Sequence, residues 1–541
     1  MKTIKSNIFL NRRLWLGSAC LAGALTLTGC SESFLEEPLR GQQTIENYYT
    51  SEEEVEQQVT GCYQTLAFDD WWQIYKFYVM NDVVTDDEWM GNTTQDPGDY
   101  KPLAFYTGNT VEAGNGVQNF YQYRFKGIFQ CNATINRSAG VTFQDENLKN
   151  RLMAEARFIR AFEYFELVRS FGGMPILTTI TMPSEAAGIE RASTEDTYAF
   201  IEQELLAAIP NLPLRSEQSS AEIGRITKGA AQGMLAKVYL YQEKYKEAEA
   251  QLQEVINSKE YKLLDNFGDV WSMDHNNSEE SLFEYQTNSD ISYNLGERIS
   301  VVVGSRDDSG WSWGLPTSNL EKAFEEEGDS VRRLWTILHH NQTFIPNDDT
   351  YNEDNPYIIT PSKHKSARAN MKLYIPLAKR PDPYDAPHIP LNYRILRYAD
   401  VLLMYAEVEN ALGKDAEAQD ALNQVRKRVG LKNVTSTGTA LRDAIRKERR
   451  LELALEGNRL FDLRRWTDDN GKKAICNVMG SNGSFVKYNL EQSTDEYEIS
   501  NQKESSDKGA NFKEGRDELY PIPNSEIIMS NGSLKQNPGY N

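Results

Sequence analysis

The chain has 541 residues, with 79 acidic against 58 basic side chains, 40% hydrophobic residues and 11% aromatic residues. This composition predicts a globular protein with a hydrophobic core, because it supplies enough apolar surface to offset the entropy of folding. The formal net charge of -21 repels phosphate backbones, so the composition excludes nucleic acid as a partner. Five histidines and five cysteines are too few for metal clusters or a disulfide framework, and we expect no cofactor.

The N-terminus has the features of a secretory signal peptide. Four basic residues precede an apolar stretch at 14–28 that is too short for a stable membrane span. Residues 27–30, Leu-Thr-Gly-Cys, resemble the lipobox of bacterial lipoproteins, which places cleavage before Cys30 and diacylglycerol on its thiol. Removal of residues 1–29 would lower the net charge from -21 to -25, because the segment holds four basic residues and no acidic one. Several acyl chains on Cys30 would anchor the protein stably to a membrane.

Residues 30–50 are predicted to form a lipidated acidic tether. The segment 31–38 resembles the acidic export signal that sends Bacteroidetes lipoproteins to the outer face of the outer membrane. No later stretch has 18 uninterrupted apolar residues, so the lipid is the expected membrane attachment. Cys62, Cys131 and Cys476 allow at most one disulfide, and we interpret them as small buried hydrophobic residues.

Amphipathic helices follow in chain order. One apolar stripe runs from Ala154 to Val168 at spacings of four and three and ends at Gly172. A second runs from Tyr198 to Ala208, after Ser193 and before Pro210. Two further segments follow the small-and-large order of a tetratricopeptide repeat, in which small residues let paired helices approach closely. Their key positions are Leu235, Ala236, Tyr239, Ala248, Leu252 and Val255 in the first and Leu402, Ala406, Ala418, Leu422 and Val425 in the second.

A third helical stretch, residues 441–466, is dense in Glu, Asp and Arg, and we interpret these residues as structural ion pairs rather than as catalytic groups. Four segments rich in Asn, Asp, Gly, Ser and Pro are predicted to be long loops that form binding surfaces: 86–119, 265–316, 341–394 and 479–518. The predicted division is a signal peptide (1–29), a tether (30–50), an N-terminal helical part (51–270) and a C-terminal part with the ligand loops (271–541).

Six motifs in one order resemble the SusD/RagB family of outer-membrane nutrient-binding lipoproteins of Bacteroidetes. They are Cys-Ser-Glu-Ser-Phe-Leu-Glu-Glu-Pro at 30–38, Ala-Glu-Ala-Arg-Phe-Ile-Arg-Ala at 154–161 with Gly-Gly-Met-Pro at 172–175, Arg-Ile-Thr-Lys-Gly-Ala-Ala at 225–231, Arg-Tyr-Ala-Asp-Val-Leu-Leu at 397–403, Glu-Arg-Arg-Leu-Glu-Leu at 448–453 with Arg-Leu-Phe-Asp-Leu-Arg-Arg-Trp at 459–466, and Tyr-Pro-Ile-Pro at 520–523 with Gln-Asn-Pro-Gly-Tyr at 536–540.

The resemblance implies a mostly α-helical fold of tetratricopeptide-like helix pairs with a loop-rich ligand-binding face and no catalytic centre. It also implies a lipid-anchored protein on the extracellular face of the outer membrane, which captures oligosaccharide or polysaccharide. The captured glycan would be delivered to a TonB-dependent, SusC-like transporter. Some members of the family pass peptides instead, so peptide capture is the alternative cargo.

Carbohydrate sites set aromatic rings against sugar faces and polar groups against hydroxyls, and two loops offer that combination. Asp87, Trp89 and Asn92 lie within six residues, and Trp89 and Asn92 resemble the platform tryptophan and nearby asparagine of the starch-binding family member. Trp311 and Trp313 would lie on one side of an extended segment, since side chains there alternate. Tyr293, in the preceding loop, would complete the aromatic set.

Two other function classes stay open from the residues alone. Acid pairs such as Asp307 and Asp308 supply the two carboxylates that a glycosidase needs, although such pairs are usual in solvated loops. The sequence lacks a His-Glu-x-x-His zinc motif, a Gly-x-Ser-x-Gly elbow and a dinucleotide fingerprint. A tetratricopeptide scaffold that binds only proteins is the second class. Acidic loops could hold calcium, but no stretch has the EF-hand spacing.

Overall fold

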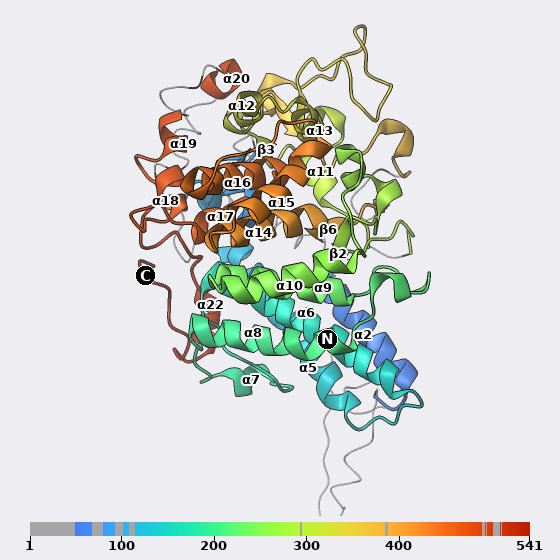
Figure 1. The fold of residues 1–541 in the computed structure, drawn as a ribbon. Coiled ribbons are helices and arrows are strands. Elements are labelled where there is room, and N and C mark those ends of the chain that lie inside the picture. The colour runs from blue at the N-terminus through green and yellow to red at the C-terminus, as the bar shows by residue number, and fades with distance from the viewer. Residues whose placement is uncertain are drawn as a thin grey trace, which may run out of the picture. The chain divides into compact units, whose positions relative to one another are not determined.

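The computed structural model describes residues 49–67, 79–91, 101–107, 114–292, 295–382, 384, 388–488, 493, 495–500, 509 and 511–540. The predicted signal peptide, Cys30 and most of the tether lie outside the described residues. The longer helices are α2 (Glu52–Ala67), α5 (Gly114–Ser138), α6 (Glu146–Phe171), α8 (Thr194–Ala208), α9 (Lys228–Tyr241), α10 (Tyr245–Ser258), α12 (Ser318–Glu327), α14 (Tyr398–Ala411), α15 (Asp415–Arg428) and α16 (Gly438–Glu452). The mostly α-helical fold is confirmed (Figure 1).

Shorter helices connect them: α4 (Lys101–Ala104), α7 (Pro183–Ala186), α11 (Ile299–Val303), α13 (Ser330–Thr336), α17 (Arg459–Arg465), α18 (Ala474–Met479), α19 (Ser484–Lys487), α20 (Glu496–Ser500) and α22 (Asn524–Met529). None of the helices in the described part of the chain combines the length and apolar character needed to cross a bilayer.

The predicted helices end where local chemistry ends them. Helix α6 begins after Asp145, whose side chain accepts a hydrogen bond from the Asn147 amide, and ends at Gly172, where φ is 81°. Helix α8 begins after Ser193, whose hydroxyl accepts from the Asp196 amide. A left-handed backbone angle favours glycine, so Gly172 stops the helix at low conformational cost.

Helix pairs form the frame, as the repeat pattern predicted. Helix α9 packs against α10, α10 against α14, and α14 against α15 and α16 (Figure 1). A small residue also lets α9 pack closely against the strand segment at 393–397: a Cβ added at Gly233 of α9 would lie 2.9 Å from Cδ2 of Leu396. The stack therefore links segments on both sides of the long loop region between residues 259 and 397.

Gly173, which follows α6, is another closely packed glycine and provides a test of backbone packing. A Cβ at this position would lie 2.0 Å from the Ala192 carbonyl oxygen and 2.7 Å from the Ser193 carbonyl carbon, both backbone atoms. We expect Gly173→Ala to lower the free energy of unfolding by about 2–3 kcal/mol, because the backbone must shift. Chemical denaturation measures this. Gly140→Ala is the control, since its nearest atom is 3.9 Å away, and a comparable loss in both variants would contradict the packing argument.

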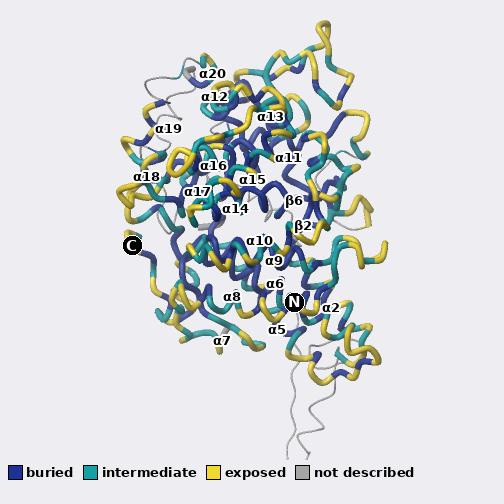
Figure 2. Tube along the Cα trace, in the orientation of Figure 1, coloured by how far each residue is buried: buried dark blue, intermediate teal, exposed yellow. Residues whose placement is uncertain are grey.

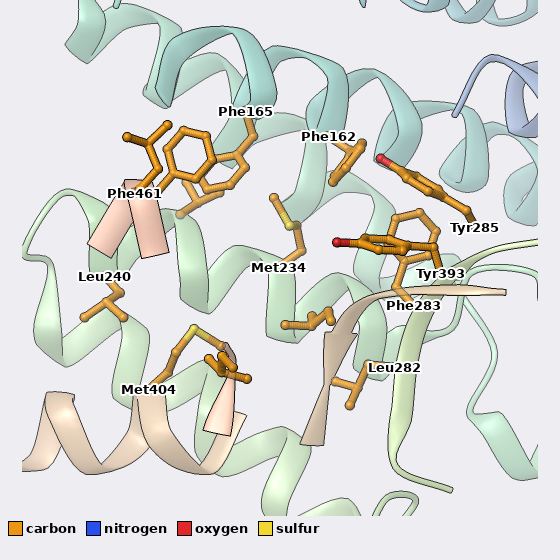
Figure 3. Close-up of a cluster of buried hydrophobic side chains, with 14 of the residues drawn as sticks. Phe162, Phe165, Met234, Leu240, Leu282, Phe283, Tyr285, Tyr393, Met404 and Phe461 are labelled. Carbon is orange, nitrogen blue, oxygen red and sulfur yellow. The ribbon is translucent and has the colours of Figure 1, made fainter. Parts of the chain in front are cut away.

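The predicted loops contain short strands, which corrects the expectation of structureless connections. Strand β2 (Ser281–Tyr285) pairs antiparallel with β6 (Tyr393–Arg397), β1 (Glu88–Trp89) with β3 (Leu315–Pro316), and β4 (Ile337–His339) with β5 (Arg368–Asn370). All five residues of β2 are buried, so the strand belongs to the core. Figure 3 shows Phe283 and Tyr285 of β2 beside Tyr393 of β6 and Phe162 of α6.

The charged stretch at 441–466 is two helices rather than the one predicted. Leu455 and Gly457 take left-handed φ values of 63° and 72°, which breaks the chain between α16 and α17. The interpretation of its charges as structural ion pairs is confirmed. Arg449 lies 2.8 Å from Asp400 and 3.1 Å from Asp462, and all three side chains are buried.

Candidate functional site

The turn at 304–313 presents two tryptophans whose rings meet edge to face. The ring centroids of Trp311 and Trp313 are 5.0 Å apart, with an interplanar angle of 68°. Trp313 is buried and Trp311 is half-buried, so the inner ring supports the outer one. Backbone bonds from both residues to the end of α11 fix the turn, at 2.9 Å for Trp311 to Val301 and 3.0 Å for Trp313 to Val302.

The two rings meet by a route different from the one predicted. The segment is not regularly extended, because Ser312 between the tryptophans has φ of 59°. Gly304 and Gly310 cross closely, and a Cβ at Gly310 would lie 2.2 Å from the Gly304 carbonyl carbon. The sequence prediction of adjacent rings therefore holds for a turn whose geometry it did not foresee.

The same turn holds an arginine among tyrosines. Asp308 binds Arg380 through two hydrogen bonds of 2.6 Å each. The Arg380 guanidinium lies 4.4 Å from the ring centroid of Tyr384 and 5.6 Å from that of Tyr374. Burial raises the pKa of Tyr384 to about 12, so its hydroxyl is a neutral donor at physiological pH. The bidentate pair fixes the guanidinium plane between aromatic side chains.

We define the Trp311 face as Asp308, Trp311, Arg380, Tyr374 and Tyr384. Of these five residues, only Trp311 was predicted from the sequence to contact a ligand. All five are half-buried, and Tyr374 also donates to Asp348 at 2.7 Å. The neighbouring loop 341–357 is mostly exposed (Figure 2). Aromatic rings beside fixed polar groups match the chemistry of sugar recognition. The density of tyrosines over 351–384 was the signal available in the sequence.

A buried histidine supports the turn from below. His364 is 0% exposed, and its Nε2 lies 3.2 Å from the Ser305 hydroxyl and 3.3 Å from the Ser312 hydroxyl. Burial lowers the pKa of His364 to about 4, against the opposing effect of Asp307. The imidazole is therefore neutral at physiological pH and joins both ends of the turn.

His364 makes stability depend on pH. Because its folded-state pKa is depressed, the unfolded chain takes up a proton near pH 6.5 that the folded chain binds only near pH 4. Stability is thus lost as pH falls through this window, by about 2–3 kcal/mol from this group. We expect denaturation curves from pH 7 to pH 4 to show a smaller loss for His364→Gln than for the unmodified protein. Equal losses in both would contradict the assignment.

The first predicted loop does not present its aromatic ring to solvent. Trp89 is 0% exposed, lies 5.6 Å from the Phe485 ring, and donates from Nε1 to Glu498 at 3.0 Å. Asp87 is also 0% exposed, and its Oδ1 lies 2.7 Å from an Arg450 nitrogen. Both side chains are buried and bind other residues of the protein, which corrects the expectation that Asp87 and Trp89 contact a ligand. Asn92 and Tyr293 lie outside the described residues.

Other sequence expectations can be placed. Cys62, Cys131 and Cys476 are buried free thiols, which confirms their interpretation as small buried residues. Burial raises the pKa of Cys476 to about 12, so this thiol is protonated and unreactive. Within the described ranges, no group of three or more His, Cys, Asp or Glu side chains is placed to hold a metal ion.

The fold defines a class of mostly α-helical proteins built from helix pairs, and comparisons with known proteins identify the family of this chain. The SusD family model matches residues 269–540, half of the chain, and a model described as "Starch-binding associating with outer membrane" matches residues 33–240. The chain belongs to the SusD family.

Similar proteins support this over most of the length. The SusD-like protein P2 of Formosa agariphila is 25% identical, over 95% of this chain and 98% of its own. A SusD-like protein of Bacteroides ovatus is 27% identical, over 82% and 81%. Among solved structures, a laminarin binding SusD-like protein has a TM-score of 0.72 at 27% identity, over 91% of this chain and 100% of its own. A SusD homolog from Bacteroides thetaiotaomicron, at 23% identity, has a TM-score of 0.72 over 92% and 99%, and shows the fold alone.

Proposed function

We propose that the protein captures oligosaccharide or polysaccharide at the cell surface and delivers it, without chemical change, to a TonB-dependent outer-membrane transporter. The observation that carries the proposal is the likeness, at 27% identity over the full length of the other chain, to a laminarin binding SusD-like protein. Laminarin is therefore the first glycan to test.

The Trp311 face is the proposed contact surface. A sugar ring would lie against the exposed side of Trp311, while Arg380 and Tyr384 donate to its hydroxyls. Because Trp313 and the Asp308–Arg380 pair already hold these groups in place, little ordering entropy opposes binding. Trp313 supports the ring from within. Asn92 and Tyr293 stay predicted contacts.

The carboxylate pairs support binding rather than hydrolysis. A glycosidase needs a free acid and a free base or nucleophile at a set separation. Here Asp307 binds Lys363 at 2.5 Å, Asp308 binds Arg380, and Asp86 binds Arg459 at 2.9 Å. Carboxylates committed to cations are poor candidates for acid or base catalysis.

The membrane attachment rests on the sequence. Acylation of Cys30 would hold the protein at the extracellular face of the outer membrane, with residues 30–50 as the predicted acidic tether. The description of the matching family model, which names association with the outer membrane, supports this location. A SusC-like transporter is the proposed receiving partner.

Affinity electrophoresis of the purified full-length protein through gels containing laminarin, starch or xylan tests the proposal. We expect retardation by at least one polysaccharide and no new reducing ends after incubation. Retardation by none, together with a rise in melting temperature on adding a peptide library, would move the cargo to peptides. Release of reducing ends would contradict the non-catalytic assignment.

A further inference from the structure

A polar cavity is lined by residues that do not belong to the Trp311 face. It has a volume of about 110 Å³ and lies between the turn at 215–227, the N-terminus of α9 and strand β2. Tyr261 and Phe283 in its wall are buried, whereas Ile223 at its rim is 57% exposed. At about 30 Å³ for each water molecule, the space suits about four waters or the end of one sugar ring.

Among the charged side chains that line this cavity, Arg215 is the one without a described counter-ion. Glu284 lies 3.3 Å from Arg394, and Arg225 lies 2.8 Å from Glu155, so these charges are compensated. Arg215 donates from Nη2 to the Asn277 carbonyl at 3.0 Å and forms no ion pair within the described part of the chain. A half-buried guanidinium without a counter-ion favours an anionic ligand.

Uncharged groups of the cavity add directional bonding. Ser281 is only 8% exposed. Its buried hydroxyl has no hydrogen-bond partner in the structure. The Gln218 amide nitrogen donates to the carbonyls of Glu222 at 3.2 Å and Arg225 at 2.9 Å, so its oxygen stays available as an acceptor. A buried hydroxyl without a partner is costly, and a ligand hydroxyl would satisfy it.

We propose that this cavity binds the carboxylate end of one acidic sugar residue, such as glucuronate. The planar guanidinium of Arg215 matches a carboxylate, and Ser281 and Gln218 match the adjacent hydroxyls. A neutral sugar leaves Arg215 without a counter-ion, and inorganic phosphate lacks the carbon skeleton that would pack against Tyr261. The site is built from other segments than the Trp311 face, so it does not depend on glycan capture there.

Calorimetric titration of the full-length protein with sodium glucuronate, glucose and inorganic phosphate tests the proposal. We expect one glucuronate to bind per chain. The affinity for glucose and for phosphate should be lower by a factor of roughly ten or more, because glucose loses the charged hydrogen bond to Arg215 and phosphate loses the packing against Tyr261. Arg215→Gln should weaken glucuronate binding by roughly tenfold or more, and Ser281→Ala by a smaller factor.

Lys246→Gln is the matched control, because it removes one positive charge at an exposed position of α10 outside the cavity. It should leave glucuronate affinity unchanged. Melting curves without ligand show whether Arg215→Gln is folded, and Arg215→Lys, which keeps the charge, should retain part of the affinity. Absence of glucuronate binding, equal binding of glucose or phosphate, or binding unaffected by Arg215→Gln would each overturn the proposal, whatever the result with laminarin.

Discussion

Replacement of Arg397 by alanine is expected to lower the free energy of unfolding by about 3–5 kcal/mol, because it removes one cation from a cluster of three buried carboxylates and leaves their charges under-compensated. The Arg397 guanidinium lies 2.8 Å from Glu456, 2.6 Å from Glu452 and 2.9 Å from Glu280. All four residues are at most 7% exposed, so water cannot replace the lost contacts. Urea denaturation followed by circular dichroism measures the loss.

The deficit should also depend on pH. Burial opposes ionisation of Glu452, but Arg428, Arg397 and Arg332 overcome it and hold its pKa well below the usual range. Its stabilisation is therefore present above about pH 4.5 and lost as pH falls. Without Arg397 the carboxylates protonate more readily, so the deficit at pH 7 should shrink towards pH 4.

Arg442→Ala is the control for this experiment. Arg442 pairs at 2.6 Å with Asp469, whose side chain is 71% exposed, and such a surface pair contributes about 1 kcal/mol at most. Equal losses for Arg397→Ala and Arg442→Ala would show that the buried network does not stabilise the fold.

Replacement of Trp311 by alanine is expected to weaken glycan binding by roughly tenfold, which corresponds to about 1.4 kcal/mol for a lost ring contact. Trp311→Phe should retain part of the affinity, because a smaller ring still covers the sugar. The fold should persist, since Trp311 is half-buried and Trp313 fills the core beneath it. Affinity electrophoresis and titration with laminarin measure the change.

Phe200→Ala is a matched control for Trp311→Ala. Phe200 is also half-buried and meets another ring edge to face, with its centroid 5.1 Å from that of Tyr164. Phe200→Ala should lower the free energy of unfolding without changing the affinity for laminarin. Unchanged binding in Trp311→Ala, or an equal loss in Phe200→Ala, would remove Trp311 from the proposed site.

The helical frame was readable from the sequence because its signals are local. The apolar spacing of 154–168, the cap at Ser193 and the stop at Gly172 act within one or two turns of the chain. The excess of paired charges in 441–466 likewise indicated ion pairs. The break at 455–457 was missed, since Leu455 shows no sign of its left-handed angle.

The site was less readable because distant contacts decide exposure. The segment around Trp89 has the composition of a sugar-binding platform. Glu498 and Phe485, about 400 residues further along the chain, contact the Trp89 ring and bury it. Arg380 is linked to the turn that carries Trp311 by its hydrogen bonds to Asp308, a contact between residues 72 positions apart in the sequence. Sequence spacing identifies a tryptophan beside acids, but it does not tell which ring faces solvent.

Hydrogen–deuterium exchange of the full-length protein with and without laminarin tests the central claim most directly. The account predicts that laminarin binds and that the amides of residues 305–313 and 374–384 exchange more slowly in its presence, while those of α8 and α15 are unchanged. Absence of any laminarin effect, or protection confined to segments outside the Trp311 face, would contradict it.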